Sequence, residues 1–180
     1  MIYLALLRGI NVGGNSKVEM PRLKALFEGL GFTEVRTYIN SGNVVFSGQK
    51  SSEAELAAVL EKAFEREFGF EVKFLIRTID NLRSVVGDLP KDWKNDAEFK
   101  TDVMFLWPDF DIKGALAELE LIDGREQLIK SEGALLWNID RKYIGRSKVL
   151  RLVGSEHYKK MTVRNCNTTR KLLELMEAQI

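Results

Sequence analysis

The sequence predicts an α+β protein with two ferredoxin-like halves in tandem. Each half is expected to have the element order βαββαβ and a mostly antiparallel sheet with helices on one face. Two observations predict this fold. Apolar segments typical of strands alternate with amphipathic helical segments in the same order in both halves. Two polar turns, at 40–43 and 131–133, occupy equivalent places in that order. We therefore expect a structural duplication that is completed by a C-terminal helix.

The first half contains six expected elements. Apolar residues at helical spacing predict its first helix, and Gly31 is a typical residue after a helix end. Ser52 and Glu55 form a capping box that predicts the start of its second helix. The expected elements are a strand over 2–8, a helix over 21–30, strands over 34–39 and 43–47, a helix from 52 to 68 and a strand over 72–76.

The second half repeats this order after a short helix near 79–86 and a polar passage that contains Pro90. We expect an N-terminal domain over 1–87, a linker over 88–98 and a C-terminal domain over 99–180 that carries a basic segment. The expected elements are a strand over 102–107, a helix over 112–119, hairpin strands over 127–129 and 135–137, a helix near 146–152, a strand near 159–164 and a final helix near 168–178.

The composition excludes several classes of protein. The chain has 180 residues, of which 45% are hydrophobic and 29% are charged, as in ordinary globular proteins. Its opening apolar run ends at Arg8 and is too short for a signal peptide or a membrane span, so we expect a cytoplasmic protein with no membrane partner. The single cysteine, Cys166, and the single histidine, His157, exclude a disulfide framework and a cysteine-rich zinc site. We expect no metal and no cofactor.

Charge is distributed unevenly along the chain. Residues 1–140 contain 17 Lys or Arg and 23 Asp or Glu, whereas 141–171 contain 10 Lys or Arg and a single acidic residue, Glu156. A basic block on an acidic body is typical of proteins with an anionic partner, and it is also typical of a solvated face that balances the body. A small anionic ligand and a nucleic acid are both expected partners, and the chain is expected to be a monomer or a homodimer.

A polar, glycine-rich loop follows the first strand and precedes a helix that opens near Pro21. Because loop N–H groups and a helix N-terminus point at the same place, this loop predicts a site for an anion. It does not match the nucleotide-triphosphate loop, since Asn15 stands at the position of the lysine. The alternative is a tight connection that needs glycine for its backbone conformation. The candidate ligand-binding residues of this loop are Arg8, Asn11, Gly13, Gly14 and Lys17.

The turn between the second and third strands carries a second polar motif. Because the first strand of a ferredoxin-like sheet is antiparallel to the third, this turn should lie beside the loop that follows the first strand. Its side chains offer hydrogen-bond donors and acceptors but no activated nucleophile, and the alternative is an ordinary hairpin turn. The candidate ligand-binding residues are Asn40, Ser41 and Asn43.

A third polar segment, 162–171, lies where the final helix begins. We expect Asn167 or Thr168 to be the cap, which places Arg170 and Lys171 in the first turn, where the helix dipole disfavours each cation by about 0.3–1 kcal/mol. A bound phosphate or carboxylate offsets this cost, or else both side chains extend into water. The candidate ligand-binding residues are Arg164, Asn165, Thr168 and Lys171.

Cys166 is either a thiol of lowered pKa beside that helix start, with His157 as its base, or a small buried hydrophobe. The sequence contains no recognisable catalytic constellation, so no residue is assigned a catalytic role.

The three motifs together resemble one bacterial family, domain of unknown function 1697. They are Ala-Leu-Leu-Arg-Gly-Ile-Asn-Val-Gly-Gly at 5–14, Tyr-Ile-Asn-Ser-Gly-Asn-Val-Val-Phe at 38–46, and Thr162 to Asn167 with Thr168, Lys171 and Leu172. The resemblance extends over essentially the whole chain. It implies a two-domain α+β fold with ferredoxin-like elements and no established activity. Many members have an aromatic residue in place of Cys166, which argues against a shared nucleophile.

Three hypotheses for the function follow. In the first, the chain is a binding module whose three motifs form one rim, where Arg8 and Arg164 contact an anion and the asparagines orient the rest of the ligand. In the second, it is an enzyme of phosphoryl or nucleotidyl transfer, with Glu19 and Asp102 as candidate bases by position alone. In the third, the motif residues serve turns and the packing of the two halves in a structural or partner-binding protein.

Overall fold

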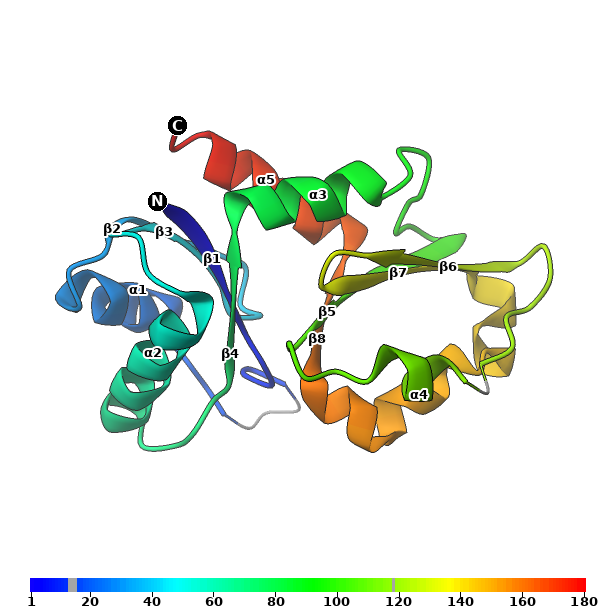
Figure 1. The fold of residues 1–180 in the computed structure, drawn as a ribbon, viewed down its shortest axis with the longest axis horizontal. Coiled ribbons are helices and arrows are strands. Elements are labelled where there is room, and N and C mark those ends of the chain that lie inside the picture. Colours follow the sequence, from blue (N-terminus) through cyan, green and yellow to red (C-terminus); the bar gives the residue numbers. More distant parts are fainter. Residues whose placement is uncertain (13–15, 118) are drawn as a thin grey trace. The chain divides into compact units, whose positions relative to one another are not determined.

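The computed structural model describes residues 1–12, 16–117 and 119–180 (Figure 1). Contacts within the chain define two compact units. One is formed by Met1–Leu82 together with Lys171–Ile180, and the other by Arg83–Arg170. The independent domains and the linker over 88–98 that the sequence suggests stay a prediction. Within the described residues, no helix combines the length and the apolar character needed to cross a bilayer.

The first unit contains a four-stranded antiparallel sheet with the strand order β2-β3-β1-β4. The central strand β1 (Ile2–Leu7) pairs with β3 (Asn43–Ser47) on one side and with β4 (Phe74–Thr78) on the other, while β2 (Thr33–Tyr38) pairs only with β3. This order is that of a ferredoxin-like sheet, as predicted.

Two helices, α1 (Met20–Gly29) and α2 (Glu53–Phe68), cover one face of this sheet (Figure 1). The predicted capping box at the start of α2 is confirmed, because Ser52 Oγ accepts from the Glu55 N–H at 3.2 Å and the Glu55 carboxylate accepts from the Ser52 N–H at 3.0 Å. Burial of large apolar groups between helices and sheet is the main stabilising term here. The largest fully buried side chains of this core are Tyr3, Phe27, Phe46, Phe64 and Phe74.

The second unit repeats the arrangement, with the strand order β6-β7-β5-β8. The strand β5 (Phe99–Leu106) is central, between β7 (Ala134–Asp140) and β8 (Met161–Asn165), and β6 (Glu126–Ser131) pairs with β7. The short helix α4 (Ile112–Leu116) lies on one face of this sheet (Figure 1). The predicted duplication of ferredoxin-like halves is confirmed.

The duplication extends to single hydrogen bonds. The Leu7 N–H donates to the Gly42 carbonyl at 2.8 Å, and the Leu106 N–H donates to the Gly133 carbonyl at 2.9 Å. Both glycines have a positive φ, 73° and 71°, which glycine adopts without the steric cost of a side chain. Each half therefore closes its hairpin against the end of its first strand in the same way.

The two halves differ in the element that precedes the last strand. Where the first unit has the long helix α2, the second has three short 3-10 helices, η1 (Arg141–Arg146), η2 (Val149–Gly154) and η3 (Glu156–Lys160). The sequence predicts a single helix near 146–152, and the structure has these three 3-10 helices over 141–160 instead. Buried Val149 and Leu152 are three residues apart, which matches the three-residue turn of a 3-10 helix as well as it matches an α-helix.

A helix follows the last strand of each sheet, α3 (Ile79–Asp88) after β4 and α5 (Cys166–Glu177) after β8. The predicted cap of α5 is wrong. The helix begins at Cys166, and Asn165 Oδ1 accepts from the Thr168 N–H at 2.8 Å, so the cap is Asn165. Arg170 consequently lies beyond the first turn, and the predicted cost of a cation in that turn does not arise.

Candidate functional site

The side chain of Asn11 fixes the loop that follows β1. Its Nδ2 donates to the carbonyl oxygens of Val18, at 3.0 Å, and of Asn40, at 2.8 Å, while its Oδ1 accepts from the Val18 N–H at 2.8 Å. Its φ of 53° lies in the left-handed region, which asparagine adopts more readily than most residues. One amide group therefore ties this loop both to the approach to α1 and to the second polar turn.

The second polar turn lies beside this loop, as predicted from the topology. The Asn11–Asn40 hydrogen bond and the Leu7–Gly42 hydrogen bond join the two segments directly. A Cβ built on Gly42 would lie 2.7 Å from Leu7 Cβ, so the two backbones approach as closely as glycine permits.

An open pocket of about 660 Å³ lies next to the Asn11 tether. Lys17 and Asn40, both exposed, line it together with Asn11. In the part of the chain that the structure describes, no carboxylate forms an ion pair with Lys17. Among the described residues, the lining is Asn11, Lys17, Val18, Glu19, Met20, Pro21 and Asn40. We call it the first-loop pocket.

The N-terminus of α1 forms part of this pocket. Its cap position is Glu19, whose side chain makes no capping hydrogen bond, and no acidic residue stands in its first turn. The positive end of the helix is therefore less neutralised than that of α2, which has a capping box with Glu53 and Glu55. The Glu19 carboxylate also lines the pocket. The site thus combines one ammonium, one carboxylate and one positive helix end.

The other residues of the second motif serve the turn itself. Asn43 is fully buried, and its Nδ2 donates to the Tyr38 carbonyl and to Ser41 Oγ, both at 3.0 Å. These bonds close the turn on its inner side. Of the three predicted residues in this motif, Asn40 is the one that reaches the pocket.

The remaining predicted residues of the first loop lie elsewhere. Arg8 is half-buried at the end of β1, where its N–H donates to the Lys73 carbonyl at 3.1 Å, and it does not line the first-loop pocket as described. Gly13 and Gly14 lie outside the described residues.

The third predicted segment belongs to the second unit up to Arg170, and its last residue, Lys171, belongs to the first. Arg164 is 8% exposed, and its Nη1 donates to Thr162 Oγ1 at 2.9 Å and to the Val163 carbonyl at 2.8 Å. Burial lowers the pKa of Arg164 to about 10, so the guanidinium stays charged at neutral pH. Thr168 is buried in the first turn of α5, where its N–H bonds to Asn165.

Two cations of the same helix have partners within the chain. Arg170 donates to the carbonyls of Trp93, at 3.0 Å, and Pro90, at 2.8 Å. Lys171 forms an ion pair of 2.6 Å with Glu174, and this hydrogen bond raises the pKa of Lys171. Neither side chain simply extends into water, because each is held by a neighbouring group.

Cys166 is a buried thiol, and burial raises its pKa. The hypothesis of a lowered thiol pKa is therefore wrong, and the alternative of a small buried hydrophobe describes the residue. The ring of His157 packs against Phe110, with a centroid separation of 5.7 Å. Among the described residues, no group of three or more His, Cys, Asp or Glu side chains is placed to hold a metal ion.

Sequence reasoning missed Arg77, a buried arginine in β4. Aligning the sequences of the two halves would have identified it. Arg77-Thr78 and Arg164-Asn165 each place an arginine, followed by a side chain that caps a helix, at the end of the last strand. The structure therefore brings Asn11, Lys17 and Asn40 together in the first unit, and Arg164, Asn165 and Thr168 in the second. One rim formed by all three motifs stays a prediction.

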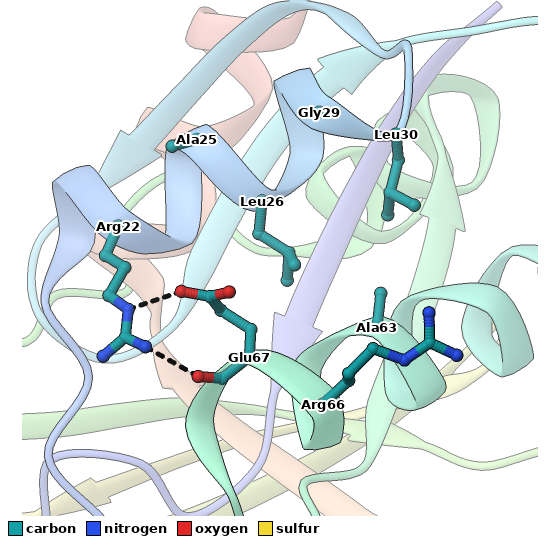
Figure 2. Close-up of a pocket in the computed structure, with 8 residues that line it drawn as sticks. All are labelled: Arg22, Ala25, Leu26, Gly29, Leu30, Ala63, Arg66 and Glu67. Atoms are coloured by element: carbon teal, nitrogen blue, oxygen red, sulfur yellow. Dashed lines mark hydrogen bonds and ion pairs between the residues drawn. The ribbon is translucent and has the colours of Figure 1, made fainter.

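A further pocket of about 380 Å³ lies between α1 and α2 (Figure 2). Leu26 of α1 and the residue that caps this helix, Leu30, line it opposite Ala63 of α2. At one end, Arg22 donates to the Glu67 carboxylate at 2.6 Å and to the Glu67 carbonyl at 2.7 Å. The second bond satisfies one of the free carbonyl groups at the C-terminal end of α2. Arg22 therefore links the two helices. None of the predicted site residues that the structure describes lines this pocket.

Two comparisons relate the chain to other proteins. The model of the family described as "Protein of unknown function (DUF1697)" matches residues 1–137. The solved structure of the conserved bacterial protein SP0830 from Streptococcus pneumoniae is 30% identical in sequence, with a TM-score of 0.82. That match covers 97% of this chain and 98% of the other. No curated protein matches the chain.

Proposed function

The chain belongs to the DUF1697 family, whose description assigns no activity, and we propose that it binds a small anionic ligand at the first-loop pocket. The ligand is a phosphorylated metabolite or a nucleotide, or the phosphate backbone of a nucleic acid. The Asn11 tether carries this proposal, because it holds exposed Lys17 and the N-terminus of α1 around one pocket.

The physical basis is the attraction of a phosphate to both positive groups. A helix N-terminus offers oriented N–H groups and a partial positive charge, and a nearby lysine adds a full charge. The pocket volume of about 660 Å³ suits a molecule the size of a nucleotide, since small-molecule sites commonly span roughly 300–1,000 Å³.

Glu19 narrows the class of ligand. A carboxylate in the pocket repels a bare phosphate but accepts hydrogen bonds from hydroxyl groups. The proposed ligand therefore carries hydroxyl or amino donors beside its phosphate, as a sugar phosphate or a nucleotide does. The proposal also includes the cytoplasmic location and the monomeric or homodimeric state expected from the sequence.

A thermal-shift screen tests the proposal. The wild type is heated with sugar phosphates, nucleotides and short RNA and DNA at low and high salt, because a specific ligand raises the melting temperature by mass action. Lys17→Met should remove the shift, whereas Lys24→Met, on an exposed lysine of α1 that pairs with Glu28, should retain it. Strong salt dependence would favour nucleic acid.

Two results of this screen would contradict the proposal. The absence of any shift, or equal losses in the two lysine variants, would reject the first-loop pocket as the binding site. Arg8→Ala tests the sequence-based expectation that Arg8 also contacts the anion, although Arg8 does not line the pocket as described. An unchanged affinity in this variant would remove Arg8 from the site.

One observation favours a transfer enzyme as a second candidate. Glu19 lines the same pocket as Lys17, so a general base and a phosphate-binding group stand together. Once a ligand is found, Glu19→Gln should keep its binding and lose its turnover. Turnover that survives this substitution would exclude Glu19 as the base.

A structural role is supported for several motif residues. The side chains of Asn11, Asn43 and Asn165 all bond to backbone groups of their own unit. If no ligand binds and substitutions at these positions only lower the melting temperature, the motifs serve the fold.

A further inference from the structure

The second unit contains a pocket of about 260 Å³ to which the three motifs and the family give no role. It lies between the sheet and the 3-10 helices. Its inner wall consists of buried apolar side chains, namely Met104, Trp137 and Met161 from the sheet and Val149 and Leu152 from η2. Lys100 and Asp102 of β5, which form an ion pair of 2.9 Å, also line it.

The difference between the two halves explains this pocket. In the first unit, the 16-residue helix α2 buries Leu56, Leu60 and Phe64. In the second unit, η1 and η3 have no buried residues, so Val149 and Leu152 of η2 make the packing contact. Because side chains at i and i+3 of a 3-10 helix eclipse one another, these two form a narrow ridge, and the pocket lies beside this ridge.

A buried carboxylate holds the walls of the pocket in place. Glu126 accepts from the Trp137 indole N–H at 2.7 Å and from the Ser147 hydroxyl. Ser147 Oγ in turn accepts from the Val149 N–H at 3.1 Å. One hydrogen-bonded chain thus fixes both the indole ring on the sheet and the start of η2. A pocket with such fixed walls is ready for a ligand without reorganisation.

We propose that this pocket binds a flat heteroaromatic molecule of one or two rings that carries a carboxylate. A cavity of about 150 Å³ accepts benzene, so 260 Å³ has room for a bicyclic ring. The indole of Trp137 and the thioethers of Met104 and Met161 are favourable contacts for an aromatic face.

The ion pair supplies the polar contacts. The Lys100 side chain is 28% exposed and presents its ammonium to the carboxylate of the ligand. The Asp102 side chain is 11% exposed, deeper than its partner, and accepts a ring N–H.

The five methionines of the chain allow a direct test. Met104 and Met161 line this pocket, Met20 lines the first-loop pocket, and Met1 and Met176 line neither. In the full chain labelled with 13C at the methionine methyl groups, indole-3-acetate should shift the Met104 and Met161 signals in a saturable manner and leave Met20 unchanged. Shifts confined to Met20, or no saturable shift at Met104 and Met161, would overturn the proposal.

Matched variants complete the experiment. Leu152→Phe fills the pocket and should abolish the saturable shifts, whereas Leu121→Phe, at an exposed position of the same unit, should leave them intact. Lys100→Met should weaken binding about tenfold, the loss of one charged hydrogen bond, and Lys130→Met on the exposed side of β6 should not. Equal effects of the two lysine variants would contradict the proposed contact. This test does not involve Lys17, so it is independent of the first-loop pocket.

Discussion

Arg77 and Arg164 occupy the same position in the two halves of the chain. Arg77 pairs across β4 with Leu4 of the first central strand, and Arg164 pairs across β8 with Val103 of the second. Each guanidinium donates from Nη1 to the carbonyl of the residue before it, at 2.9 Å and 2.8 Å. The two arginines are 5% and 8% exposed. A buried arginine is therefore part of the repeated unit.

This relationship predicts similar costs for the two substitutions Arg77→Met and Arg164→Met. Each removes charged donors from buried acceptors, so each should lower the free energy of unfolding by about 1–3 kcal/mol in urea denaturation. Arg36→Met is the control on the exposed edge strand and should cost less than about 1 kcal/mol. A neutral or stabilising Arg164→Met would contradict a stabilising role for Arg164 in the fold.

Asn11 should stabilise the first loop through its side-chain hydrogen bonds. Asn11→Ala loses three of them and also places a Cβ at a φ of 53°, so a loss of about 2–4 kcal/mol is expected. Asn11→Gly keeps the backbone conformation and should cost about 1 kcal/mol less. Urea denaturation gives both values, and hydrogen exchange should show faster exchange of the Val18 N–H. Wild-type stability in Asn11→Gly would mean that the tether contributes nothing.

Gly42 should be much harder to replace than Gly31, another glycine with a positive φ. A Cβ there would lie 2.7 Å from Leu7 Cβ and 2.9 Å from Ile10 Cδ1, in addition to the cost of its φ of 73°. Gly31→Ala is the matched control, since its φ is 86° and nothing lies within 4 Å. In thermal and urea denaturation, the free energy of unfolding should fall by about 1 kcal/mol in Gly31→Ala and by more than about 3 kcal/mol in Gly42→Ala. Equal costs would place the two segments farther apart than described.

Cys166 should react slowly with thiol reagents in the native protein. Burial raises its pKa above the usual value of 9.0, so little thiolate forms at pH 8, and the sulfur is also covered. A thiol-disulfide reagent should label it fast only after unfolding. Fast native labelling at pH 8 would revive the hypothesis of an activated thiol.

The raised thiol pKa also has a defined effect on stability. The thiol of the unfolded chain ionises near pH 9.0, while the buried thiol stays neutral to higher pH. The contribution of this thiol to the free energy of unfolding is therefore complete below pH 9.0, and it is lost as the pH rises through the native pKa. Compared with Cys166→Ala, the wild type should lose melting temperature more steeply above pH 9.0.

The local sequence determined the order of the elements, the start of α2 and the duplication. The Ser52 and Glu55 pair acts within one helical turn, and the spacing of apolar residues reports the backbone period directly, so neither needs knowledge of distant residues. The sequence also predicted that the first loop and the second polar turn lie side by side, because an antiparallel sheet fixes which strand ends meet.

Only the tertiary structure decided what the polar side chains do. The choice of Asn165 as the cap of α5, the use of Asn11 as a tether and the burial of Arg77 depend on groups that meet across turns and strands, where several polar residues compete for the same partners. The pocket beside Trp137 arises in the same way. The segment Val149–Gly154, whose apolar spacing predicts a helix, forms a 3-10 helix. The space between this helix and the sheet results from side-chain packing, which no local sequence pattern encodes.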